Sequence, residues 1–174
     1  MNSALLLAVN QQILHEQTIA HACDALSLYF GRIQMPGLGA FMRRQMREER
    51  RHARRLIRHV AARGGEVELA GIPAPKGDFS SPLDAANWAK QMQHTTTELI
   101  HKLHEMAGEE EDDVLETLLN RFVATQVKNE KWTNELSDAI EQFQDRAASM
   151  LMLDAQWGRR RERTTKKRVR VDGL

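Results

Sequence analysis

Glycine and proline are gathered at a few points of this 174-residue chain, and they divide it into long uninterrupted segments. The breaks fall within residues 31–39 and 64–82, at Gly108 and at Gly158. Both residue types disfavour the interior of a helix, so the segments between the breaks can each form a continuous helix. No segment shows sustained period-two alternation with β-branched residues. The sequence therefore predicts an all-α fold.

Four long helices and a short fifth helix are predicted, over about 3–30, 38–63, 82–106, 112–144 and 147–157. Ser81 and Pro82 form a typical helix start, with a serine N-cap before a proline at the first helical position. The first and third connections are short and make antiparallel neighbours. The connection over 65–80 is long enough to span the bundle, so the second and third helices should run parallel. This order predicts a four-helix bundle with one long crossover.

Charge is distributed unevenly along a chain whose net charge is only +1. Residues 159–174 carry eight Lys or Arg and two acidic residues, which gives this tail a charge of +6. We expect one folded domain over residues 1–158 and a disordered basic tail over 159–174. The single cysteine excludes an internal disulfide. The absence of a signal-peptide pattern and of a membrane span predicts a cytoplasmic protein.

Ionisable residues interrupt the apolar stripes of the first two predicted helices. Glu49 and His52 are three residues apart and share the face that otherwise carries Leu38, Met42, Leu56 and Val60. Glu16 interrupts the inner stripe of the first helix in the same way. Burying such groups costs several kcal/mol unless they are paired or bound to a metal. The motif Glu-x-x-His in a helical bundle is a known iron or manganese ligand pair, although a buried hydrogen-bonded pair is the alternative.

Three passages resemble bacterial non-haem ferritins: Asn10–Glu16, Phe41–His52 and Phe122–Gln126. The resemblance covers roughly residues 5–157 and implies a ferritin-like bundle with a short fifth helix. It also implies that Glu16, Glu49 and His52 bind the first iron of a ferroxidase centre, with Glu49 as the bridging carboxylate. Gln126 matches a glutamine that the family places at the centre. Iron, as Fe²⁺ and Fe³⁺, is the metal that the resemblance implies.

The chain departs from the ferritin pattern at the second iron position. Gln93 stands where the third helix of the family supplies a glutamate, and Asn129 replaces a glutamate of the fourth helix. Neutral amides are poor substitutes for anionic oxygen ligands. We therefore expect a vestigial second site and weak or impaired ferroxidase activity. The alternative is that both residues are ordinary core amides, which is compatible with one metal ion at the first site.

The resemblance further implies a closed homo-oligomer of 24 subunits that stores iron ions. The predicted fifth helix supports assembly, because it carries more apolar surface than a short helix leaves exposed: Met150, Leu151, Leu153 and Trp157. The second helix carries eight arginines between residues 43 and 58, and in a ferritin-like shell its polar face points into the cavity. A basic interior, together with the basic tail, favours phosphate or another polyanion as a partner.

A second hypothesis is a ferritin-fold protein that binds or protects nucleic acid through the basic tail, as DNA-protecting mini-ferritins do. The tail over 159–174 has no aromatic residues among its cations, so such binding would involve phosphates and no base recognition. The intra-bundle positions of Glu16, Glu49 and His52 favour iron storage over this alternative. The family's usual chain path implies a tail that enters the cavity, and a tail in solvent that binds DNA is the alternative.

Overall fold

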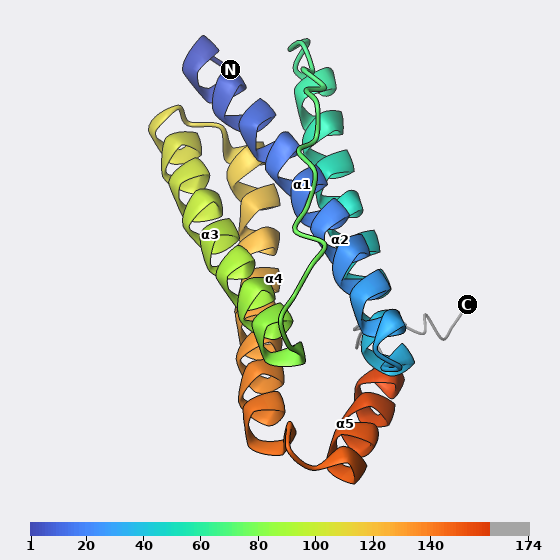
Figure 1. Cartoon of the computed structure of the whole chain (residues 1–174). Helices are drawn as coiled ribbons and strands as arrows, with labels where there is room; N and C mark the ends of the chain where they lie inside the picture. Colours follow the sequence, from blue (N-terminus) through green and yellow to red (C-terminus); the bar gives the residue numbers. More distant parts are fainter. Residues whose placement is uncertain (161–174) are drawn as a thin grey trace, which may run out of the picture.

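Four long helices form the bundle and a fifth, shorter helix crosses one of its ends (Figure 1). They are α1 (Ser3–Arg32), α2 (Pro36–Ala62), α3 (Pro82–Glu109), α4 (Asp113–Phe143) and α5 (Ala147–Arg159). The structure is a computed structural model that describes residues 1–160. The prediction of an all-α bundle with a short fifth helix is confirmed. The sequence analysis predicted a disordered tail over 159–174. Arg159 instead belongs to α5, and residues 161–174 lie outside the described part.

Local sequence signals fix several helix ends where the sequence predicted them. The Ser81 side chain accepts a hydrogen bond from the Asp84 backbone N–H at 3.0 Å, and Pro82 begins α3. Gly64, just after the end of α2, has a positive φ of 67°, a conformation that glycine adopts without the Cβ clash of other residues. Gly108 was predicted to lie in the turn after the third helix, but α3 continues to Glu109 and includes it.

The crossover between α2 and α3 runs along the length of the bundle, and both helices run in the same direction (Figure 1). This arrangement confirms the predicted parallel pair. The buried side chain of Asn10 attaches the crossover to α1. Its Nδ2 donates to the Glu66 carbonyl at 3.0 Å, and its Oδ1 accepts from the Glu68 backbone N–H at 3.1 Å. One asparagine thus satisfies two backbone groups of an otherwise irregular segment.

Two apolar clusters form the core, one toward each end of the bundle. The cluster near α5 includes Leu26, Phe30, Leu38, Trp132 and Leu136, and the cluster at the other end includes Leu5, Ile13, Leu56, Ile100 and Phe122. The buried polar residues of the predicted metal site lie between these clusters along α1 and α2. The two cores therefore hold a polar layer in the middle of the bundle.

The fifth helix docks on the N-terminus of α2. The Asp154 carboxylate accepts hydrogen bonds from the backbone N–H groups of Gly37 at 3.0 Å and Leu38 at 2.7 Å. An anion at a helix N-terminus satisfies free N–H donors and interacts favourably with the helix dipole. The helix was predicted to end before Gly158, but this residue lies inside α5. A Cβ there would come within 2.9 Å of the Gly37 Cα, so close helix packing explains the glycine.

The apolar surface of α5 is divided between its own bundle and solvent. Leu153 and Trp157 are buried, and the Trp157 ring packs edge-on against Phe41 with 4.8 Å between ring centroids. Leu151 and Met152 are 64% and 74% exposed. The intrachain core therefore covers part of the surface that the sequence analysis assigned to assembly.

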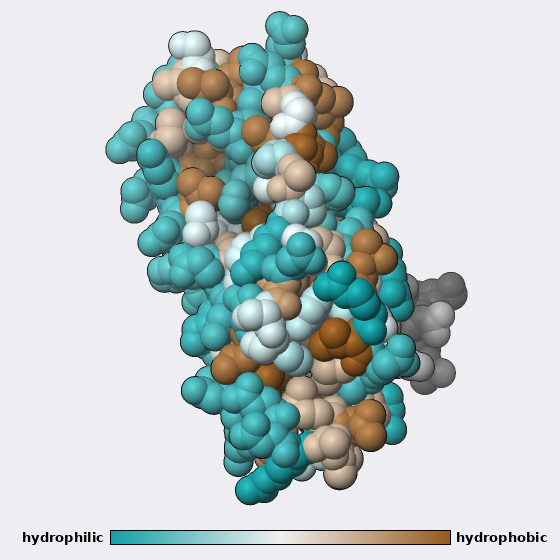
Figure 2. All heavy atoms as spheres, viewed as in Figure 1, coloured by the Kyte–Doolittle hydropathy of each residue, from teal (hydrophilic) through white to brown (hydrophobic). Residues whose placement is uncertain are grey.

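The outer surface is mostly hydrophilic, with separate hydrophobic patches on the face shown in Figure 2. Exposed apolar side chains include Leu7 and Leu28 of α1 and Leu69 of the crossover. Within residues 1–160, no helix combines the length and apolar character that a membrane span requires.

Candidate metal centre

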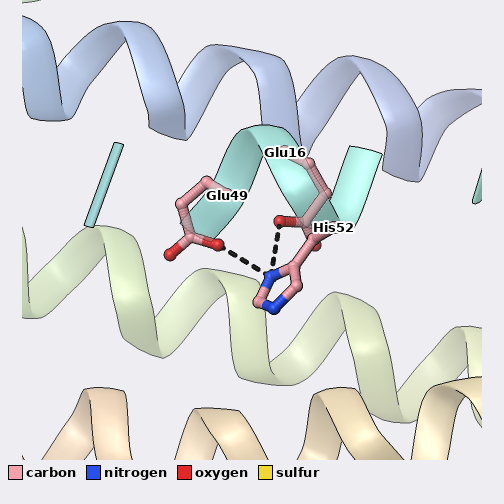
Figure 3. A group of neighbouring side chains, drawn as sticks. All are labelled: Glu16, Glu49 and His52. Carbon is pink, nitrogen blue, oxygen red and sulfur yellow. Dashed lines mark hydrogen bonds and ion pairs between the residues drawn. The ribbon is translucent and has the colours of Figure 1, made fainter. Parts of the chain in front are cut away.

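Glu16 of α1 meets Glu49 and His52 of α2 in the middle of the bundle (Figure 3). One ligand atom from each of the three side chains lies within 4.8 Å of the other two. His52 Nδ1 is 2.9 Å from a Glu49 oxygen and 3.5 Å from a Glu16 oxygen. All three side chains are buried, as their places on the apolar stripes predicted. We call these residues the Glu-Glu-His triad.

The Glu16 carboxylate contains an oxygen without a hydrogen-bond donor. Its Oε1 accepts from Gln12 Nε2 at 2.7 Å, whereas its buried Oε2 makes no hydrogen bond and has only the ion-pair contact with His52 at 3.5 Å. A buried carboxylate oxygen that accepts no hydrogen bond is costly, and a metal cation is a partner that removes this cost. Two carboxylates and an imidazole are also a donor set that ferrous iron accepts. The residues present therefore fit a single divalent metal ion.

Burial and mutual charge set the protonation of the triad. Burial raises the pKa of Glu16 to about 7, against the opposing effect of the nearby His52 imidazole. Burial also disfavours the charged form of His52, but the contacts with Glu16 and Glu49 and their charge attraction outweigh it and raise the His52 pKa to about 10. Burial likewise favours the uncharged form of Glu49, yet the His52 hydrogen bond keeps the Glu49 pKa below its usual value. In the absence of metal, the imidazolium thus balances the charge of Glu49, and Glu16 takes up a proton as the pH falls below about 7.

The ring of Phe122 in α4 covers the His52 imidazole, with 4.5 Å between ring centroids and an interplanar angle of 31°. This contact restricts the orientation of the imidazole. It also separates the triad from the apolar cluster beyond Phe122.

The second iron position predicted as vestigial is filled by a cluster of amides. Gln93 Nε2 and Asn129 Nδ2 both approach Glu49 Oε1, at 3.1 and 3.4 Å. Asn129 Nδ2 also donates to Gln126 Oε1 at 2.8 Å, and Gln126 Nε2 donates to Gln93 Oε1 at 3.1 Å. The Trp132 indole N–H donates to Asn129 Oδ1 at 3.2 Å. The cluster thus satisfies its own polar groups and directs N–H donors at Glu49.

The structure brings together Glu16, Glu49 and His52 as predicted, and it places Gln126 in the amide cluster. The hydrogen bonds of Gln126 go to Gln93, Thr97 and Asn129. Its predicted role as a metal ligand stays a prediction.

Sequence reasoning did not single out Gln12, the residue that hydrogen-bonds to Glu16. It is buried one helical turn before Glu16, so the i,i+4 spacing and the polar interruption of the stripe were an available signal. His15 was not singled out either. Its Nε2 lies 2.8 Å from Thr96 Oγ1 and links α1 to α3.

Comparison with known proteins gives consistent results at the levels of sequence and structure. A bacterial non-heme ferritin of Staphylococcus aureus (strain USA300) is 28% identical over 160 residues, which cover 92% of this chain and 96% of that protein. The bacterial non-heme ferritin of Staphylococcus haemolyticus (strain JCSC1435) is 30% identical over 145 residues, which cover 83% of this chain and 87% of that protein.

Solved ferritin structures superpose on nearly the whole chain. An open pore ferritin from the archaeon Archaeoglobus fulgidus matches with a TM-score of 0.88 and 29% identity, covering 92% of this chain and 99% of that one. A humanized archaeal ferritin matches with a TM-score of 0.89 and 29% identity, covering 93% and 99%. The family model described as "Ferritin-like domain" matches residues 6–143. Taken with the bundle topology and the buried triad, these matches show that the chain belongs to the ferritin family.

Proposed function

We propose that this protein stores iron as a subunit of a ferritin-like shell, and that the Glu-Glu-His triad binds one Fe²⁺ per subunit. Iron is the cargo in this proposal. The observation that carries it is the buried Glu16 Oε2, which has no hydrogen-bond donor and lies next to His52 and Glu49. A divalent cation bound there would replace the missing donor and neutralise both carboxylates. Binding would require that His52 release its proton, so metal and proton compete for the triad.

We further propose that ferroxidase activity is weak. A second ferrous ion beside Glu49 would face Gln93, Gln126 and Asn129, which are neutral amides. The N–H groups of Gln93 and Asn129 point at Glu49 Oε1, the oxygen that would have to bridge to the second ion. Without two adjacent irons, O₂ must accept electrons in less favourable single steps. Slow oxidation is the expected consequence.

Anaerobic titration with Fe²⁺ tests the metal proposal directly. We expect saturation near one tight equivalent per subunit, and loss of that equivalent in Glu49→Gln, which keeps the size of the side chain. His94 and Glu98 provide a matched control, because they form an exposed carboxylate–imidazole pair with a 3.6 Å separation. Glu98→Gln should leave the titration unchanged. Two equal tight equivalents in the unmodified protein would contradict the amide argument.

Assembly into a homo-oligomer of 24 subunits is also part of the proposal. The exposed Leu151 and Met152 on α5 support an interface there, since their neighbour Leu153 is already buried within the chain. Light scattering of the full-length protein should give a single large species. A monomer or dimer at micromolar concentration would reject the shell.

The nucleic-acid alternative rests on the tail, and residues 161–174 lie outside the described part of the chain. It therefore stays a prediction from sequence, as do the cytoplasmic location and the boundary between residues 158 and 159. The two described residues of the predicted tail lie on the domain: Arg159 ends α5, and Arg160 stacks on the Trp157 ring with 4.1 Å between its Cζ and the ring centroid.

A further inference from the structure

The face of α2 that points away from its own bundle, and that would line the cavity of a ferritin-like shell, carries an unbroken band of arginine side chains. At 100° per residue, eight arginines fall within an arc of about 140°, directly opposite the buried stripe. Between residues 43 and 58 no other residue type occupies this arc. Seven of the eight are exposed, and Arg44 is half-buried. We call this surface the arginine face: Arg43, Arg44, Arg47, Arg50, Arg51, Arg54, Arg55 and Arg58.

Contacts with other elements occupy some members of the arginine face. Arg43 donates to Ser27 Oγ at 3.0 Å, and Arg50 donates to Asp24 Oδ2 at 3.2 Å, both on α1. Arg44 donates to the backbone carbonyl of Trp157 on α5 at 3.0 Å. These contacts hold α2 against its neighbours in the bundle.

Four members have no such partner. No residue of the described part, 1–160, forms an ion pair or a hydrogen bond with the side chains of Arg47, Arg54, Arg55 or Arg58. They lie within three turns of one helix and all are exposed. Their guanidinium groups, with five donors each, are available to an external anion.

The band is unfavourable for the isolated helix. Like charges at i,i+4 destabilise a helix by a few tenths of a kcal/mol per pair, and the face contains several such pairs. In the pair Arg54–Arg58, neither side chain has a compensating contact within residues 1–160. A local rule broken in this way is typical of a functional surface. A multivalent anion along the helix would remove the repulsion and satisfy the free donors together.

The residue type indicates the chemistry of that anion. Residues 36–63 contain nine arginines and no lysine, although lysine would serve equally well for solubility. Arginine differs from lysine in its planar fork, which binds phosphate through two parallel hydrogen bonds. The face carries no aromatic side chain on which a nucleic-acid base could stack, because the aromatic residue of α2, Phe41, is buried. The surface therefore offers forked donors that suit phosphate groups and no platform for base stacking.

We propose that the arginine face binds an inorganic phosphate polymer, with its chain lying along α2. Arg43 and Arg58 are about 22 Å apart along the helix axis, which is too long for one orthophosphate and suits a linear chain of phosphates. The site is on the opposite side of α2 from the Glu-Glu-His triad. The inference goes beyond iron binding and does not depend on it.

Binding of fluorescently labelled polyphosphate to the full-length protein, dissociated into subunits so that the arginine face is accessible, tests the proposal. The variant Arg47→Gln, Arg54→Gln, Arg55→Gln and Arg58→Gln removes four charges at exposed positions where glutamine preserves helix propensity. We expect its affinity to fall at least tenfold, and the slope of log affinity against log salt to shrink by about three. A matched control removes four charges from the tail: Lys166→Gln, Lys167→Gln, Arg168→Gln and Arg170→Gln. That control should retain most of the affinity.

Three outcomes would overturn the proposal. Equal affinity of the α2 variant and the unmodified protein would assign polyphosphate binding to the tail or to no site. Tighter binding of single-stranded DNA than of polyphosphate, lost in the same variant, would replace the inorganic polymer by nucleic acid. Equal binding of polyglutamate would remove the phosphate preference. Circular dichroism and light scattering of each variant show whether fold and assembly are intact. Replacing the same four arginines by lysine keeps the charge and should still weaken binding, because lysine lacks the planar fork.

Discussion

Gln93 Nε2 donates a hydrogen bond to Glu49 Oε1 at 3.1 Å, on the side of the carboxylate that faces away from His52. The two oxygens of Glu49 thus have different surroundings. Oε2 faces the imidazole at 2.9 Å, and Oε1 faces amide donors. A metal ion can bind Oε1 only if the amide donors move away from it. The hydrogen bond from Gln93 to Glu49 therefore favours one metal position over two.

Restoring anionic ligands at the amide cluster should create the second iron position. For Gln93→Glu combined with Asn129→Glu, we expect two Fe²⁺ equivalents in anaerobic titration and faster oxidation after mixing with O₂ in a stopped-flow instrument. The metal-free variant should be less stable by several kcal/mol, because two more carboxylates are buried without partners. If the unmodified protein already oxidises iron as quickly as this variant, ligand charge does not limit the reaction.

Replacing the Glu16 carboxylate by an amide should separate the effect on metal affinity from the effect on stability. Glu16→Gln keeps the shape of the side chain and deletes a buried charge, so the melting temperature of the metal-free protein should stay the same or rise. Its Fe²⁺ affinity should fall by more than about a hundredfold, while Gln12→Leu, which removes only the residue that orients Glu16, should weaken binding about tenfold. A large loss of metal-free stability in Glu16→Gln would mean that Glu16 serves structure alone.

Stability of the metal-free protein should decrease with rising pH. The pKa of Glu16 is raised from 4.5 to about 7, so its favourable contribution is complete below pH 4.5 and is lost as pH rises to 7. The pKa of His52 is raised from 6.5 to about 10, so its contribution is complete below pH 6.5 and is lost as pH rises toward 10. Glu49, with a lowered pKa, acts in the opposite sense, and its contribution is lost only as pH falls below its usual range.

Thermal unfolding in the presence of a chelator, at intervals between pH 5 and pH 9.5, measures this dependence. The difference between the unmodified protein and Glu16→Gln isolates the triad, because other titrating groups are common to both. Fe²⁺ affinity should change in the opposite direction and increase with pH, since metal competes with the proton on His52. An Fe²⁺ affinity that is constant across this range would argue against the triad as the binding site.

The docking of α5 should depend on the absence of a side chain at Gly37. A Cβ at this position would overlap the backbone carbonyl of Asp154, so Gly37→Ala should destabilise the protein by about 1–3 kcal/mol and weaken assembly. Gly31→Ala is the matched control, because no atom lies within 4 Å of the added Cβ, and helix propensity predicts a gain of about 0.5–1 kcal/mol. Thermal unfolding and light scattering measure both effects. Similar behaviour of the two variants would show that α5 packs differently in solution.

The amino-acid sequence by itself determined the helices, their order and the residues of the triad. Breaks at glycine and proline define where a helix can run, and the 3.6-residue period determines which side chains face inward. Glu16, Glu49 and His52 were identifiable because each interrupts an apolar stripe. Such signals are local, so they need no knowledge of how distant segments meet.

Tertiary structure alone decided what each buried polar atom contacts. The pairing of Gln93 with Glu49 Oε1 joins residues 44 positions apart, and no local pattern specifies which oxygen of a carboxylate an amide approaches. The same holds for Asp154 at the N-terminus of α2 and for Gly158 inside α5, where a glycine that resembles a helix stop is needed for close packing. Helix periodicity fixes the face on which a side chain lies. The partner on that face depends on packing between helices, which only the folded chain establishes.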